Sequence, residues 1–92
     1  MKIDLQFSGT SIRNRVQEFI EGRFLAGSGL DKVKPDDSLL EKGIIDSTGI
    51  LEVIDFLEET FQIRIMDEEL VPDNLDSINK VVGFIKRKIT PN

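Results

Sequence analysis

The fold is decided by residues 46–61, which read DSTGILEVIDFLEETF. Apolar residues recur there at i, i+3, i+4, i+7 and i+11, which is the spacing of one face of an α-helix (Ile50, Val53, Ile54, Leu57 and Phe61). Asp46 comes directly before this pattern, where an aspartate can cap a helix N-terminus. The stretch therefore predicts an amphipathic helix with Ser47 in its first turn.

Two more segments, one on each side of this helix, carry the same periodicity. Their apolar faces are Ile12, Val16, Phe19, Ile20 and Phe24 in the first, and Ile78, Val81, Val82, Ile85 and Ile89 in the last. We interpret the apolar faces of all three helices as core. Thr10 or Ser11 is expected to cap the first helix, and Asp76 or Ser77 the last.

The segments between these helices differ in kind. Residues 26–46 contain Gly27, Gly29, Pro35 and Gly43 and predict a long loop. We expect its apolar residues to hold it on the core (Leu30, Val33, Leu39, Leu40, Ile44 and Ile45). Met66 to Leu70 predicts one short helical turn, which Pro72 ends. The expected fold is an all-α bundle of three long helices and one short helix with a long first loop.

The chain of 92 residues is long enough for one domain. We expect residues 10–90 to form it and residues 1–9, where Ile3, Leu5 and Phe7 alternate with polar residues, to be a tail. No stretch approaches the roughly 20 apolar residues of a membrane span, so we expect a cytoplasmic monomer.

Cysteine and histidine are both absent from the sequence. Their absence excludes disulfides, thiolate metal sites and the commonest general base. We therefore expect no metal site and no catalytic residues. We also expect that the chain is not an enzyme. Any chemistry has to come from a cofactor or a partner.

The net charge of −5 is distributed unevenly. Residues 1–45 hold seven acidic and seven basic side chains, residues 46–76 hold ten acidic ones and Arg64, and residues 77–92 hold four basic ones. The acidic middle would be repelled by nucleic acid and by anionic lipid. It suits a partner with a basic surface, although it is also what a solvated helix face looks like.

Ser47 is the candidate functional residue. In the first turn of a helix the backbone N–H groups lack partners and the helix dipole is positive, which favours a phosphate group. An Asp-Ser pair at a helix start is also common as a simple cap. The pair alone does not separate these two interpretations.

The surrounding sequence resembles the acyl carrier protein family over roughly residues 10–90. The signature of that family is an Asp-Ser-Leu triplet that opens the second helix, matched here by Asp46 and Ser47. The resemblance extends to Gly43, to the acidic helix that ends at Phe61, and to three further strings (Asp36-Asp37-Ser38-Leu39, Asp67-Glu68-Glu69-Leu70 and Asp76-Ser77-Ile78).

The resemblance implies that a phosphopantetheinyl transferase attaches 4'-phosphopantetheine from coenzyme A covalently to Ser47, helped by Asp46. The thiol of the arm then holds an acyl group as a thioester. The implied partners are an acyl- or aminoacyl-activating ligase and acyltransferases or synthases with basic docking surfaces. The implied pathways are fatty acid and lipid biosynthesis or secondary metabolism.

Docking of these enzymes is implied for the second helix and the short one after it. The candidate docking residues are Thr48, Ile50, Glu52, Asp55, Glu59, Asp67 and Glu68. Thr48 departs from the family's leucine, which indicates a specialised carrier. Gly49 beside it is interpreted as adding flexibility, at a cost of up to about 1 kcal/mol relative to alanine.

Three alternatives stay open. The first is an aminoacyl or peptidyl carrier of a nonribosomal or D-alanine pathway, and the second is an unmodified helical adaptor in which Ser47 only caps a helix. A hydrolase that uses Ser47 and Asp46 is the least favoured, because the chain has no histidine to act as base.

Overall fold

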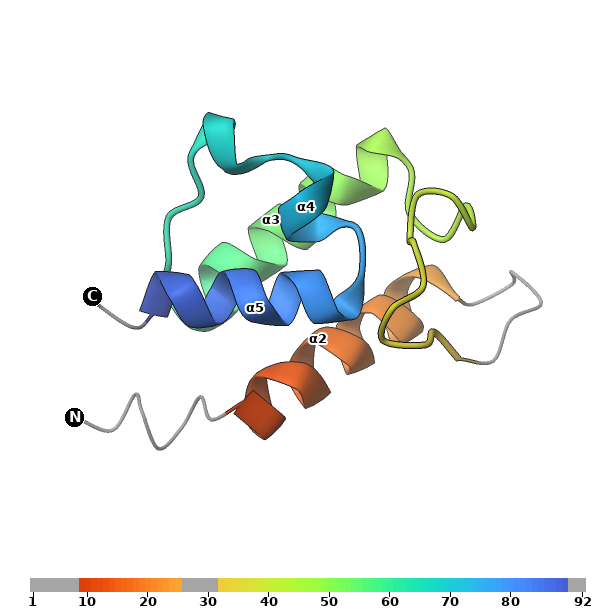
Figure 1. The fold of residues 1–92 in the computed structure, drawn as a ribbon, viewed down its shortest axis with the longest axis horizontal. Helices are drawn as coiled ribbons and strands as arrows, with labels where there is room; N and C mark the ends of the chain where they lie inside the picture. Colours follow the sequence, from red (N-terminus) through yellow and green to blue (C-terminus); the bar gives the residue numbers. More distant parts are fainter. Residues whose placement is uncertain (1–8, 26–31, 90–92) are drawn as a thin grey trace.

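The computed structural model describes residues 9–25 and 32–89, and within these ranges the protein is all α. The helices are α2 (Gly9–Phe24), α3 (Ser47–Phe61), α4 (Pro72–Leu75) and α5 (Ile78–Ile89), with a 3-10 turn, η1 (Asp67–Glu69), before α4. In Figure 1, α5 lies in front of α3, with α2 below it and α4 above it. The predicted bundle of three long helices and one short one is confirmed. The predicted tail, except for Gly9, and the loop residues Gly27, Gly29 and Leu30 lie outside the described residues.

The core is built from the predicted apolar faces. Ile12, Val16 and Ile20 of α2 meet Val53, Leu57 and Phe61 of α3 and Val81 and Ile85 of α5, all of them buried. Phe19, Phe24 and Ile54 were predicted in the core but are only partly buried. Phe19 instead stacks on Phe56 of α3 with ring centroids 4.0 Å apart, at the rim of the α2–α3 contact. Phe19 and Phe24 therefore lie at the edge of the core, whereas Phe61 and Phe84 are buried in it.

The helix starts confirm two of the predicted caps. Asp46 caps α3, and the Ser77 hydroxyl accepts a hydrogen bond from the Lys80 N–H at 3.1 Å at the head of α5. The predicted cap of α2 is wrong, because the helix begins at Gly9 and includes Thr10 and Ser11.

Pro72 has the opposite role to the predicted one. The turn predicted at Met66–Leu70 is present as η1, but Pro72 opens α4 and does not merely end the turn before it. Proline is favoured in the first position of a helix, where its missing N–H would have no acceptor and its fixed φ angle is already helical.

The long loop is attached to the start of α5. The Asp76 carboxylate accepts hydrogen bonds from the Ser38 hydroxyl at 2.6 Å and the Leu40 N–H at 3.0 Å, and the Asp76 carbonyl accepts one from the Leu39 N–H at 2.8 Å. The backbone N–H of Asn79 donates a hydrogen bond to the Pro35 carbonyl at 3.0 Å. The predicted anchors Val33, Leu39, Ile44 and Ile45 are buried, whereas Leu40 is 43% exposed and that prediction is wrong. Asp76 holds Leu40 by its backbone, which leaves the side chain at the surface.

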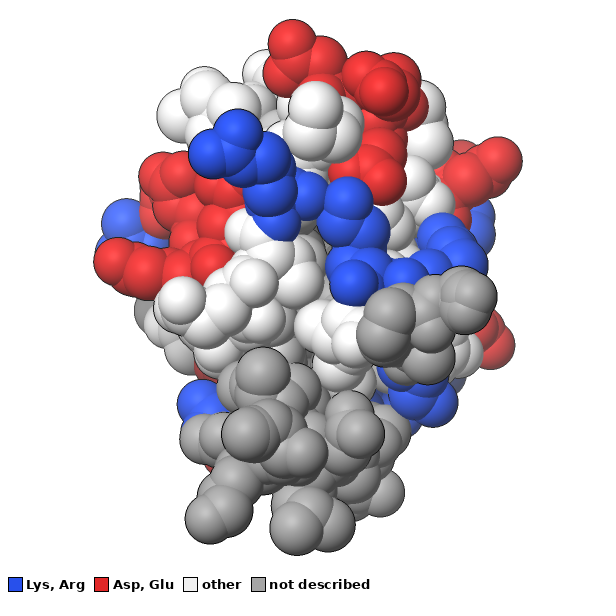
Figure 2. Space-filling model, turned by 90° about the vertical axis from the view of Figure 1, so that its left-hand side faces the viewer, with Lys and Arg blue, Asp and Glu red and all other residues white. Residues whose placement is uncertain are grey.

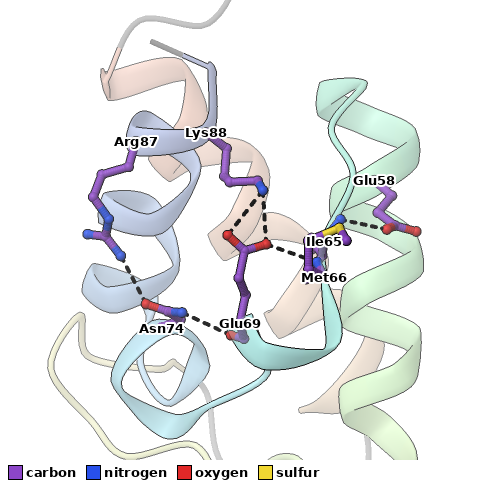
Figure 3. Close-up of polar contacts among 7 residues, drawn as sticks. All are labelled: Glu58, Ile65, Met66, Glu69, Asn74, Arg87 and Lys88. Carbon is purple, nitrogen blue, oxygen red and sulfur yellow. Dashed lines mark hydrogen bonds and ion pairs between the residues drawn. The ribbon is translucent and has the colours of Figure 1, made fainter. Parts of the chain in front are cut away.

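The segment from η1 to α4 is fastened to both neighbouring helices by polar contacts (Figure 3). The Lys88 ammonium donates to the Glu69 carboxylate at 2.9 Å, and the Arg87 guanidinium donates to the Asn74 side-chain carbonyl at 2.9 Å. On the other side, the Ile65 N–H donates to the Glu58 carboxylate of α3 at 2.9 Å. The Met66 N–H and then the Lys88 ammonium hold the pKa of Glu69 below its usual range.

Candidate functional site

Ser47 is the first residue of α3, and it is exposed. Asp46 precedes it in extended conformation, and its Oδ1 accepts a hydrogen bond from the Gly49 N–H at 2.7 Å. Within the described part of the chain, the structure gives the Ser47 hydroxyl no hydrogen bond. The hydroxyl therefore lies at the positive end of the helix dipole and open to an incoming group.

The turn before Ser47 sets its position. Gly43 has a φ of 70°, in the left-handed region that glycine adopts without strain. This turn lets the Ile44 N–H donate to the Leu39 carbonyl at 2.9 Å and places the side chains of Ile44 and Ile45 in the core. The chain then leaves the core at Asp46, which brings Ser47 to the surface.

Gly49 lies in a packed contact between the start of α3 and the end of α2. A Cβ atom at this position would lie 2.9 Å from Cε1 of Phe24 and 3.2 Å from Cγ2 of Ile45. Both contacts are closer than side-chain atoms comfortably approach. The absence of a side chain at residue 49 therefore lets the first turn of α3 rest against the end of α2.

A small apolar recess lies beside the Ser47 hydroxyl. Its volume is about 240 Å³, and its walls come from the loop, from α3 and from the η1–α4 segment (Leu40, Ser47, Ile50, Leu70, Val71, Pro72, Leu75 and Asp76). Ile50 is half-buried in it, and Leu40, Leu70 and Val71 keep about two-fifths of their surface exposed. The recess can take an apolar group of a few atoms that approaches from Ser47.

The predicted docking residues fall into two groups. Thr48 and Ile50 lie beside Ser47 in the first turn of α3. Asp55 and Glu59 are exposed further along α3, and Asp67 and Glu68 are exposed on η1. Glu52, also a predicted docking residue, is half-buried and accepts a hydrogen bond from Nε of Arg23 at 2.5 Å.

Basic side chains gather elsewhere. The end of the molecule that carries the last turn of α5 shows a band of Lys and Arg side chains between groups of acidic ones (Figure 2). Lys86, Arg87 and Lys88 lie in that turn, where cations also offset the helix dipole.

The sequence analysis did not single out Arg23, Arg13 or Asn79. Arg13 donates to the Asn79 side-chain carbonyl at 2.6 Å, and Asn79 donates to Asp36 at 2.5 Å, so that α2, α5 and the loop meet at one amide. These partners are 66 and 43 residues apart in the chain, and no local pattern marks them. For Arg23, the one local feature that could have drawn attention to it is that it is a basic residue in the last turn of α2.

Two kinds of feature, a carboxylate metal site and a membrane-spanning helix, are absent from the described residues. Its acidic side chains form no group of three that could hold a metal ion. None of its helices has the length and apolar character needed to cross a bilayer.

Comparison with known proteins places this geometry in a class. The chain is 30% identical over 78 residues to the probable acyl carrier protein PigG of Serratia sp. (strain ATCC 39006), which covers 83% of this chain and 86% of that protein. It is 33% and 36% identical over 51 residues to D-alanyl carrier proteins of Streptococcus uberis and Streptococcus pyogenes, which covers 55% of this chain and 65% of theirs. No protein-family model matches the chain.

These relatives are carrier proteins and not enzymes, and the helical bundle with an exposed serine heading its second long helix fits that class. At this identity and coverage, the chain belongs to the acyl carrier protein family.

Proposed function

We propose that the chain carries an acyl group as a thioester on a 4'-phosphopantetheine arm attached to Ser47, within a carrier domain of residues 10–90. The observation that supports this most directly is the exposed Ser47 hydroxyl in the first position of α3, directly after a capping aspartate. When bound, the arm supplies the thiol that this chain, without cysteine, does not have.

The residues around Ser47 fit a phosphodiester. The first N–H groups of α3 have no acceptor within the helix, and only that of Gly49 is taken by the Asp46 side chain. Asp46 is fixed by this hydrogen bond, so its carboxylate stays beside Ser47 without covering the hydroxyl. It thereby offers a partner enzyme an oriented acid next to the serine that is modified.

The neighbouring recess gives the attached group an apolar surface. Ile50, Leu70 and Val71 face the same small volume as Ser47, so the first atoms of the arm or its cargo can leave water there. Partner enzymes then approach over α3 and η1, where Asp55, Glu59, Asp67 and Glu68 are exposed. A basic docking surface would complement these carboxylates.

An intact-mass measurement tests the proposal. The purified chain is incubated with a broad-specificity phosphopantetheinyl transferase and coenzyme A, next to Ser47→Ala and the matched control Ser38→Ala. The expected result is a gain of one phosphopantetheine group in the wild type and in Ser38→Ala, and none in Ser47→Ala. An unchanged wild-type mass would instead support an unmodified helical adaptor.

A D-alanyl or other aminoacyl cargo is the second candidate, because the D-alanyl carrier proteins align with this chain. Loading assays on the modified chain separate the two. We expect a thioester to form with an acyl-activating ligase, ATP and free fatty acid, and none with a D-alanine-activating ligase, ATP and D-alanine. If only the D-alanine-activating ligase loads the chain, the cargo is an aminoacyl group, and Ser47 is still the attachment residue.

A further inference from the structure

Arg23 and Glu52 form an ion pair between the end of α2 and the second turn of α3. The distance from Nε to Oε1 is 2.5 Å, and the two side chains keep 60% and 40% of their surface exposed. The pair therefore lies on the surface and not inside the core. Among the described residues, the other two ion pairs join Lys42 to Asp37 and Lys88 to Glu69, so no other acidic residue of α3 is paired with a cation.

This pairing divides the acidic face of α3 into two parts. Along the helix, Glu52 lies about 8 Å from Ser47, Asp55 about 12 Å and Glu59 about 18 Å. On this face of α3 Glu52 is paired with Arg23, and the first carboxylate without a cation among the described residues is that of Asp55. Asp46, which directly precedes Ser47 and caps the helix, also has no cation partner in the described part of the chain.

The surface hollows show the same division. A shallow hollow of about 350 Å³ beside Thr48 has Arg23 in its wall together with the carboxylates of Glu52 and Asp46. A second hollow of about 540 Å³ is lined by Asp55, Glu58, Glu59 and Gln62, three carboxylates with no cation. The first can receive a group of either sign, whereas the second selects a cation.

Arg23 has further capacity to bind. A guanidinium has five N–H donors, and Nε supplies the one that Glu52 accepts. The terminal nitrogens of an arginine so exposed can bond a carboxylate of a docked protein. They would equally repel a lysine or arginine placed over Glu52.

We propose that Arg23 selects the docking partner of this carrier. The partner is an enzyme whose surface is basic where it faces Asp55 and Glu59, and uncharged where it faces Arg23. An enzyme that is basic along the whole of α3 is disfavoured, so Arg23 acts as a specificity residue by repulsion. This inference rests on the proposed function, because it takes docking on α3 as the step that brings an enzyme to Ser47.

The test measures the KM for the carrier with one probe, a phosphopantetheinyl transferase whose carrier-binding surface is basic throughout. Glu52→Gln in the wild-type chain should raise KM about threefold, because it leaves the positive charge of Arg23 without its partner. Asp55→Asn should raise KM about threefold. Arg23→Gln should lower KM about threefold, and adding Glu52→Gln to Arg23→Gln should raise it again by a similar factor.

The matched control is Arg15→Gln. Arg15 is exposed on the same helix and, among the described residues, forms no ion pair, so this variant removes the same charge at a different place. Its KM should stay within about 1.5-fold of wild type. Thermal unfolding of every variant verifies that the bundle is intact, and all differences should shrink at high salt.

The outcomes separate the two proposals. If the wild type gains no phosphopantetheine, the proposed function fails. If the wild type is modified but Arg23→Gln does not lower KM, then Arg23 does not repel the basic probe and the inference is wrong. Equal KM values for Arg15→Gln and Arg23→Gln would overturn it as well.

Discussion

Replacing Gly49 by alanine should destabilise this protein, although alanine is the better helix former. In a helix interior the exchange gains about 0.5–1 kcal/mol of folding free energy. Here the new Cβ atom would lie 2.9 Å from Phe24 and 3.2 Å from Ile45. The Phe24 ring packs edge-on against Phe19 with centroids 5.9 Å apart, and Ile45 is 1% exposed, so neither neighbour can withdraw freely.

The magnitude follows from these two opposing effects. Forcing an extra carbon into a packed contact costs about 1–3 kcal/mol. After the gain in helix propensity is subtracted, Gly49→Ala should lower the free energy of unfolding by about 1 kcal/mol. Gly22→Ala is the control, because a Cβ atom there meets nothing within 4 Å and the variant should gain up to about 1 kcal/mol.

Urea unfolding followed by far-ultraviolet circular dichroism measures both variants against the wild type. In a domain of this size 1 kcal/mol corresponds to about 4–8 °C in Tm, so the two variants should melt on opposite sides of the wild type. Shortening the neighbour with Phe24→Leu should remove most of the penalty of Gly49→Ala. If Gly49→Ala is stabilised as much as Gly22→Ala, the steric reasoning is refuted.

Substitutions at three further positions test the polar contacts around the site. Asp46→Ala should cost about 1 kcal/mol in urea unfolding because it removes the cap of α3, whereas Asp46→Asn, which can still accept the hydrogen bond, should cost less. The lowered pKa of Glu69 means that its carboxylate stabilises the fold above the ordinary glutamate pKa and that this contribution is lost as the pH falls through the lowered value. The urea midpoint should therefore fall less between about pH 7 and about pH 3 in Glu69→Gln than in the wild type; an equal fall would contradict this. Asp76→Ala should cost about 2 kcal/mol through its two lost hydrogen bonds and should speed hydrogen exchange at the Leu40 amide, and an unchanged exchange rate would show that the loop is held by other contacts.

The sequence predicted those parts of the fold that depend on local pattern. Apolar spacing located α3 and α5, and the Asp46 cap followed from its place one residue before the repeat. Pro72 was misinterpreted because proline both ends and begins helices, and the choice depends on the residues that then pack, here the buried Leu75. The hydrogen bond from Ser38 to Asp76 was not predictable, because 38 residues separate the two in the chain.

At the candidate site, too, local features were predictable from the sequence and contacts between distant residues were not. An exposed serine in the first turn of a capped helix is a local property, and the structure has it. The packing role of Gly49 and the neutralisation of Glu52 both depend on the end of α2, more than twenty residues away in the chain. A single sequence carries no signal for such contacts, so Gly49 was interpreted by its propensity and Glu52 by its charge alone.

The two sides of Ser47 are built by contacts that do not overlap. On one side, Leu70 and Val71 form the wall of the apolar recess, and their segment is held to α5 through Glu69 and Lys88. On the other side, the charge beside Thr48 is set by Arg23 at the end of α2. A substitution in η1 or α4 can therefore change the recess without touching the ion pair. On the proposed function, the fit of the attached group and the choice of partner enzyme can change independently, because Leu70 and Val71 are positioned through α5 and the ion pair through α2.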